Sequence, residues 1–176
     1  MKKNKVYRLA CLILAAAMVL PLGVYAADAK KTEEKEETEE TQEQTTYEEV
    51  SVSSAQDLAD LAKRCRLDSA SRNLKVTLTQ NISLTEYPNL EIPTFGGIFD
   101  GGSHKITGYV IDAEGSAQGL FRYLQEGGRV QNLEVAGRLN PTGSASQIGG
   151  IVGVNSGTLE NLSFSGTLEG TNRLGG

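Results

Sequence analysis

The chain has 176 residues, of which 17 are Lys or Arg and 22 are Asp or Glu, and its formal net charge is −5. Only 6% of the residues are aromatic and no cluster of basic residues stands out, which argues against a nucleic-acid partner. A single histidine and two cysteines are too few for a zinc site, and no glycine-rich phosphate loop opens a helix. We therefore expect neither a metal nor a cofactor.

Residues 1–26 have the composition of an export signal. An apolar stretch from Leu9 to Val24 follows a basic start, and Ala26 completes a signal cleavage site. The basic residues are Lys2, Lys3, Lys5 and Arg8. A membrane anchor is the alternative, but Pro21 and Gly23 interrupt the stretch before the roughly 20 residues that a span needs. We expect a secreted or cell-surface protein without a membrane span once the signal is removed.

Residues 27–49 contain ten acidic residues and three lysines, a net charge of −7, with almost nothing apolar to bury. Such a segment cannot offset the entropy cost of folding, and its like charges repel one another. We expect a disordered linker, with an acidic cation-binding segment as the alternative. The charges are nearly balanced from residue 50 onward, so the folded module is expected at residues 50–176.

Residues 54–65 are predicted to form an amphipathic helix. Ser54 can cap its first turn, and Asp57 can return the hydrogen bond and complement the helix dipole. The apolar residues that follow at helical spacing are Leu58, Leu61, Ala62 and Cys65. We expect the helix to cover one end of the fold that follows. Cys65 would then be a buried, unreactive thiol and not a catalytic partner of His104, the only histidine.

The segment after this helix predicts strands, beginning with the alternating residues 74–78. From Gly97 a glycine-rich unit recurs at intervals of 22 to 31 residues, which is typical of stacked coils. Each unit ends with apolar residues on both sides of a Gly or Asn, and in a straight strand these would face opposite sides. A left-handed bend at Gly108, Asn132 and Asn161 removes the conflict. The pattern predicts a parallel β-helix with these three residues in one row of corners.

The last unit resembles a known family. Its residues Ile148-Gly149-Gly150-Ile151-Val152-Gly153 and Leu159-Glu160-Asn161-Leu162-Ser163-Phe164 are similar to the GLUG-type repeat of bacterial surface and secreted proteins. Residues 95–106 resemble the segment that often leads into such repeats, so the resemblance covers about residues 95–176. It implies a right-handed β-helix in large, adhesin-like extracellular proteins. It implies no catalytic residues, because the motif is structural.

Parallel β-helices also occur in polysaccharide lyases and glycosidases, so an enzyme is the main alternative. Such enzymes need two carboxylates that face one groove. The acidic candidates are instead scattered, namely Asp100, Asp112, Glu114 and Glu134. Asp100 lies in a Phe-Asp-Gly-Gly turn, where aspartate commonly binds its own backbone, and His104 follows as a lone polar residue. We expect no catalytic, cofactor-binding or metal-binding residues.

The sequence therefore predicts an all-β parallel β-helix with an N-terminal capping helix. Its expected function is a non-catalytic scaffold or adhesive module of an exported bacterial surface protein, with an extracellular glycan or a host or cell-surface protein as partner. The alternatives are the N-terminal part of a carbohydrate-active β-helix enzyme and a structural spacer before a downstream catalytic domain. Residues 173–176 repeat the start of the previous unit, residues 147–150, so the sequence looks truncated within a coil whose outer edge is unpaired.

Overall fold

The computed structural model describes residues 46–144, 146–170 and 172–175. The expected signal and residues 27–45 of the expected linker lie outside the described residues. The described part contains one helix, α1 (Ala55–Arg64), and twelve strands. The strands are β1 (Glu48–Val52), β2 (Leu74–Leu78), β3 (Ile82–Ser83), β4 (Ile92–Phe95), β5 (Ile98–Asp100), β6 (Lys105–Ile111), β7 (Phe121–Leu124), β8 (Arg129–Leu139), β9 (Ser146–Gly149), β10 (Val152–Asn155), β11 (Thr158–Leu168) and β12 (Asn172–Gly175).

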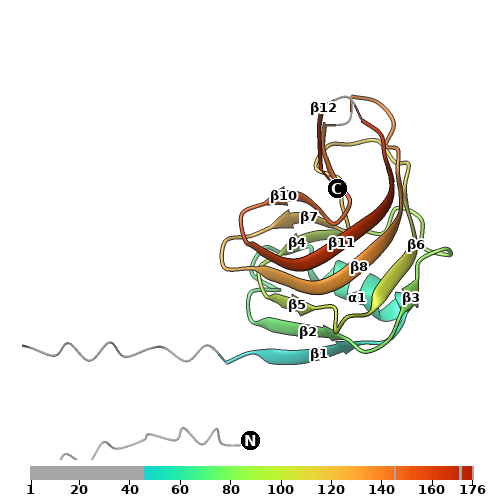
Figure 1. Cartoon of the computed structure of the whole chain (residues 1–176). Coiled ribbons are helices and arrows are strands. Elements are labelled where there is room, and N and C mark those ends of the chain that lie inside the picture. The colour runs from blue at the N-terminus through green and yellow to red at the C-terminus, as the bar shows by residue number, and fades with distance from the viewer. Residues whose placement is uncertain (1–45, 145, 171, 176) are drawn as a thin grey trace, which may run out of the picture. The chain divides into compact units, whose positions relative to one another are not determined.

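The strands form a parallel β-solenoid of about four turns, which confirms the predicted fold class (Figure 1). We call these turns rungs: rung 1 contains β2 to β4, rung 2 β5 to β7, rung 3 β8 to β10, and rung 4 β11 and β12. The largest sheet contains β1, β2, β5, β8 and β11 together with β3 and β6. A second sheet contains β4, β7 and β10, and β9 pairs with β12. Each of these pairings is parallel.

Strands β8 and β11 bend in the middle, so each contributes to two faces of the solenoid. Residues 129–131 of β8 pair with β5, and residues 134–139 pair with β6. The bends lie at Asn132 and Asn161, whose φ angles of 54° and 52° are left-handed. Nδ2 of Asn161 donates to Oδ1 of Asn132 at 3.1 Å, so the two corners are stacked and hydrogen-bonded. The corner prediction is confirmed for these two residues.

Gly108 does not lie in this row of corners, so that part of the prediction is wrong. Its φ of 65° is left-handed, but it lies inside β6 at an irregularity between Ile106 and Tyr109. The corner of rung 2 is instead the turn at residues 101–104, whose backbone donates to the carbonyl of Asn132. This turn uses several residues, whereas rungs 3 and 4 each use a single Asn. Aligning the sequence of rung 2 with those rungs therefore predicted the corner at Gly108, several residues after its actual position.

A second row of left-handed residues was not predicted. Ala117, Gln147 and Arg173 have φ angles of 58°, 61° and 53°. The next residue after each of them, namely Gln118, Ile148 and Leu174, pairs with its equivalent in the neighbouring rung. The sequence repeat of residues 147–150 at residues 173–176 therefore marks a second corner of the solenoid.

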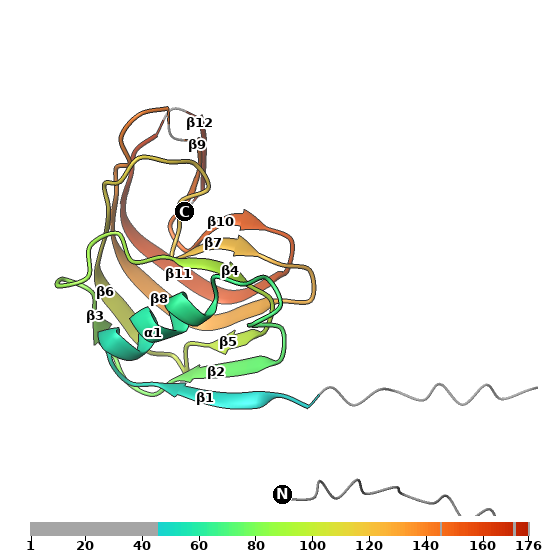
Figure 2. The same cartoon turned by 180° about the vertical axis from the view of Figure 1, so that it is seen from behind.

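Helix α1 lies across the N-terminal end of the core, as expected for a cap (Figure 2). The side chain of Ser54 accepts a hydrogen bond from the backbone N–H of Asp57 at 3.1 Å. The carboxylate of Asp57 accepts hydrogen bonds from the backbone N–H and the hydroxyl of Ser53, one residue before the expected partner. The whole predicted apolar stripe is buried, namely Leu58, Leu61, Ala62 and Cys65.

The folded module begins earlier than expected, because β1 starts at Glu48 and pairs with β2. The last two residues of the predicted linker, residues 27–49, therefore belong to the solenoid. Glu48 forms an ion pair with Arg64 of α1, and Glu49 forms one with Lys75 of β2 at 3.0 Å. These cations reduce the repulsion on which the linker prediction rested, and they come from distant parts of the sequence.

The centre of the core is a cluster of three phenylalanines that joins rungs 1 and 2. Phe95 of β4, Phe99 of β5 and Phe121 of β7 are each 0% exposed. Their ring centroids are 5.1 to 6.2 Å apart, mostly edge to face. Such aromatic pairs contribute about 0.5 to 1.5 kcal/mol each beyond the burial of their surface. The first two rungs are thus held together without a disulfide, since the described cysteine, Cys65, is free.

Candidate functional site

Asp100, one of the four acidic candidates from the sequence, lies at the end of β5 and is held by three hydrogen bonds. Its carboxylate accepts from the backbone N–H of Gly102 at 2.9 Å, from Nε2 of Gln131 at 2.7 Å and from Nδ2 of Asn132 at 3.1 Å. Partial burial opposes ionisation, but these hydrogen bonds and the charge of Lys75 outweigh it and lower the pKa of Asp100. The group is therefore a bound carboxylate at neutral pH.

The other acidic candidates have separate partners. Asp112 accepts from the side-chain amide of Asn89 at 2.8 Å, and Glu134 pairs with Lys105. Glu114 is exposed in the loop after β6, and His104 is half-buried in the turn at the rung 2 corner. Across the ranges that the structure describes, no group of three His, Cys, Asp or Glu residues is placed to hold a metal ion.

A buried polar cluster near β4 and β7 was missed by the sequence reasoning. Burial raises the pKa of Glu91 to about 6, against the opposing effects of a hydrogen bond from Gly119 and the charge of Arg122. The Glu91 carboxylate lies 3.7 Å from Nε of Arg122. When the side-chain amide of Gln118 is oriented to donate, its nitrogen lies 2.6 and 2.9 Å from the two carboxylate oxygens of Glu91. Glu91 precedes a short strand and carries no sequence signal that distinguishes it from a surface carboxylate.

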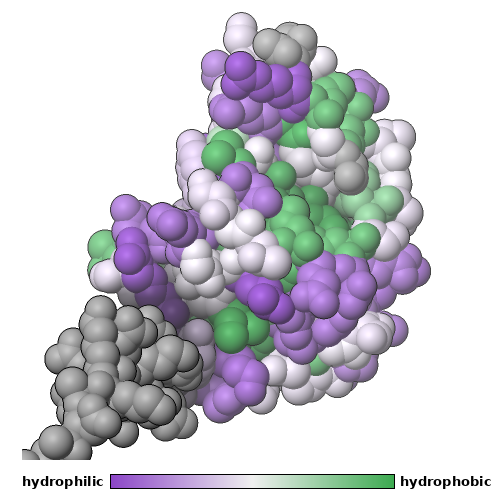
Figure 3. Space-filling view, turned by 60° about the vertical axis from the view of Figure 1, so that its left-hand side comes forward, coloured by the Kyte–Doolittle hydropathy of each residue, from purple (hydrophilic) through white to green (hydrophobic). Residues whose placement is uncertain are grey.

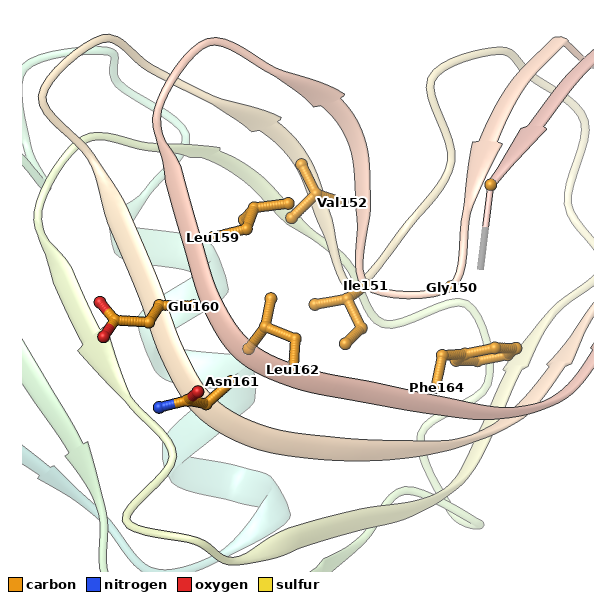
Figure 4. A pocket seen from close by; sticks show the side chains of 9 residues that line it. Gly150, Ile151, Val152, Leu159, Glu160, Asn161, Leu162 and Phe164 are labelled. Carbon is orange, nitrogen blue, oxygen red and sulfur yellow. The ribbon is translucent and has the colours of Figure 1, made fainter.

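A hollow lies at the C-terminal end of the solenoid. Its volume is about 420 Å³. Figure 4 shows that the apolar side chains of this hollow come from the segment around β10 and from β11 and face a common space. The lining residues are Gly150, Ile151, Val152, Leu159, Glu160, Asn161, Leu162, Phe164 and Gly175. Figure 3 shows hydrophobic residues gathered in a hollow on one face of the molecule.

Comparison of rungs 3 and 4 explains why this surface is apolar. Leu159 pairs in register with Val130, and Phe164 pairs with Val135. The two valines of rung 3 are 0% exposed, whereas Leu159 is 42% exposed. Phe164 and its neighbour Leu162 are half-buried. Rung 4 covers rung 3, and no strand in the described part of the chain covers rung 4.

Close packing within the hollow depends on glycine at position 150. A Cβ atom added to Gly150 would clash with the ring of Phe164, because it would lie only 2.2 Å from the nearest ring carbon. Any larger residue would therefore push the aromatic ring out of the hollow. The glycine repeated in the sequence at this point lets the segment between β9 and β10 approach β11.

This part of the chain, residues 144–169, matches the family model described as the GLUG motif. The chain carries a GLUG motif. In the structure the GLUG motif comprises β9, β10 and β11, and it includes the corner at Asn161 and most of the wall of the hollow. The resemblance recognised in the sequence is confirmed, over a narrower range than residues 95–176.

Two longer relatives are similar to part of the chain. Halomucin of Haloquadratum walsbyi is 35% identical over 83 residues, which is 47% of this chain and 1% of the relative. A Gly-rich membrane protein of Evansella cellulosilytica is 32% identical over 98 residues, which is 49% of this chain and 11% of the relative. The chain therefore spans only a small part of the length of either relative. No solved structure matches the chain. Among the described residues, no helix is both long enough and apolar enough to cross a membrane.

Proposed function

We propose that the chain is a non-catalytic solenoid module of an exported bacterial surface protein, with a scaffold or adhesive role. Its partner would be an extracellular glycan or a protein of a host or other cell surface. The GLUG motif and the printed names of the two relatives, halomucin and a Gly-rich membrane protein, suggest a surface or structural protein. The basic and apolar residues expected to form an export signal support the same location.

The observation that supports a structural and not a catalytic role for Asp100 is the set of hydrogen bonds to its carboxylate. A carboxyl group that acts as a general acid must hold a proton near neutral pH, which requires a raised pKa. The pKa of Asp100 is lowered, and its three donors come from its own turn and from the adjacent rung. The geometry supports a carboxylate that holds two rungs together.

The proposal is tested by incubating the full chain with uronate-rich and neutral polysaccharides. New reducing ends and the absorbance of unsaturated uronates are measured for the wild type, Asp100→Asn and the control Asp112→Asn. We expect no product from any of the three, together with a lower melting temperature for Asp100→Asn. Product formed by the wild type and lost in Asp100→Asn would overturn the proposal and favour a carbohydrate-active enzyme.

The adhesive role is tested separately with the same glycans immobilised on a surface. We expect the full chain to be retained by at least one glycan or by intact cells, and not by the uncoated surface. Absence of retention on all of them would leave the scaffold role and remove the adhesive one.

A further inference from the structure

The side-chain amide of Gln118 is buried between Glu91 and Gly115, at the second corner of the solenoid. Gln118 follows the left-handed residue Ala117 and is only 2% exposed, so its amide has little contact with water. One terminal atom of the amide lies 2.6 and 2.9 Å from the two carboxylate oxygens of Glu91. The amide nitrogen can also face Gly115, where an added Cβ atom would lie 2.8 Å from it. Because an amide has nearly the same shape in both orientations, both fit this space.

The protonation state of Glu91 decides which orientation of the amide is satisfied. An ionised carboxylate only accepts hydrogen bonds, so it needs the amide nitrogen of Gln118 in front of it. A protonated carboxyl has a hydroxyl that must donate. Its other polar neighbours are donors, namely the backbone N–H of Gly119, 3.1 Å from Oε1, and the guanidinium of Arg122, 3.7 Å from Oε2. The amide oxygen of Gln118 is therefore the acceptor within reach of a protonated Glu91.

The charged and titratable groups around Glu91 allow both protonation states near neutral pH. The charge of Arg122 on β7 favours the ionised carboxylate, but burial outweighs it and raises the pKa of Glu91 to about 6. Tyr109 of β6 stays neutral, because burial and the charge of Glu91 raise the pKa of its hydroxyl. Lys63 of α1 and Arg66 line a depression beside Glu91, but both are exposed, so solvent screens their charges.

We propose that Gln118 is the moving part of a proton-controlled switch between rungs 1 and 2. When Glu91 is ionised, Nε2 of Gln118 donates to the carboxylate. When Glu91 takes a proton from solvent on Oε2, the amide turns over and its oxygen accepts a hydrogen bond from that hydroxyl. Oε1 of Glu91 keeps its hydrogen bond from Gly119 in both states. This inference does not depend on the proposed scaffold or adhesive function.

NMR of the full 176-residue chain, labelled with nitrogen-15 and carbon-13, tests the switch. The side-chain amide protons of Gln118 are assigned by their loss in Gln118→Met. When the nitrogen faces Gly115, these protons lie close to Hα of Gly115, and a nuclear Overhauser effect connects them. We expect this effect at about pH 4.5 and its loss at about pH 7.5, with a midpoint at the pKa of Glu91, about 6.

Two variants identify the group that controls the orientation. Glu91→Gln cannot ionise, and its own amide can donate to the oxygen of Gln118, so the effect should be present at both pH values. The matched control is Glu114→Gln, which removes an exposed carboxylate from the same loop and should behave like the wild type. An effect that is unchanged between the two pH values in the wild type would overturn the proposal without any variant. So would a pH dependence that persists in Glu91→Gln or is lost in Glu114→Gln.

Discussion

At the scale of single residues, the polar side chains at the corners of the solenoid are bound to one another. Asp100 accepts a hydrogen bond from Asn132, and Asn132 accepts one from Asn161, so three rungs are linked in series. A typical intramolecular hydrogen bond contributes about 0.5 to 1.5 kcal/mol to stability. The left-handed backbone at the two asparagines adds a conformational requirement that few other residues meet.

Replacing Asn132 separates these two contributions. Asn132→Val loses both hydrogen bonds and places a β-branched residue in a left-handed conformation, so we expect a loss of stability on the order of 1 to 3 kcal/mol from strain alone. Asn132→Gly loses the same hydrogen bonds but adopts the backbone conformation freely, so its loss should be smaller. Urea unfolding measures both values. Equal losses for the two variants would contradict a strained corner at this position.

Glu91 predicts a pH dependence of stability. Burial raises the pKa of this carboxyl to about 6 from an ordinary value of 4.5. The folded state therefore binds the proton more tightly than the unfolded chain. This stabilisation is fully present below pH 4.5 and is lost as the pH rises through about 6. Arg122 and Gly119 reduce the effect but do not reverse it.

Glu91→Gln isolates this contribution, because the amide does not titrate. The free energy of unfolding of the wild type minus that of Glu91→Gln should fall by about 1 to 2 kcal/mol between pH 4.5 and pH 6. Urea unfolding at a series of pH values gives the difference directly. A difference that rises with pH over this window would mean that the ion pair with Arg122 dominates over burial.

At the scale of elements, α1 covers the outer side of rung 1, whereas no described strand covers the outer side of rung 4. Its apolar stripe covers the N-terminal end of the core, and Cys65 at its C-cap is 0% exposed. Burial raises the pKa of the Cys65 thiol to about 11, although the charge of Arg64 opposes this. A neutral, covered thiol is a poor nucleophile.

Alkylation of Cys65 measures how firmly α1 covers the core. In a Cys11→Ser background, which leaves one thiol, we expect iodoacetamide to modify Cys65 only when urea unfolds the chain. Cys65→Ser should lower stability by about 1 to 3 kcal/mol, because it buries an additional polar group. Rapid modification of the folded protein would show that α1 opens readily or does not pack as described.

The sequence was most informative where one rung repeats another with a single-residue corner. The helical stripe and the corners at Asn132 and Asn161 follow from local periodicity, and the GLUG motif was recognised by its resemblance to a known repeat family. The corner of rung 2 was missed because its turn at residues 101–104 has more residues than the later corners. The partners of Glu48 and Glu91 were missed because they come from distant segments, and no local pattern specifies such contacts.

At the scale of the whole molecule, the two ends of the stack differ. One end has a helix, charged side chains and an edge strand with two carboxylates, and the other has an apolar hollow beside a long, nearly uncharged edge. All of these properties depend on parallel, in-register stacking of successive rungs. Because the outer faces of β8 and β11 carry exposed or half-exposed side chains, that register can be measured by cross-linking.

Disulfide formation between Glu134→Cys and Ser163→Cys, in the Cys11→Ser background, tests this stacking most directly. The two positions pair in register between β8 and β11, and disulfides need Cα atoms about 4.4 to 6.8 Å apart. The control pair, Glu134→Cys with Ser165→Cys, is displaced by two residues along β11. We predict rapid cross-linking within one chain for the first pair and slow cross-linking for the control. Equal rates, or a faster control, would contradict the in-register parallel solenoid.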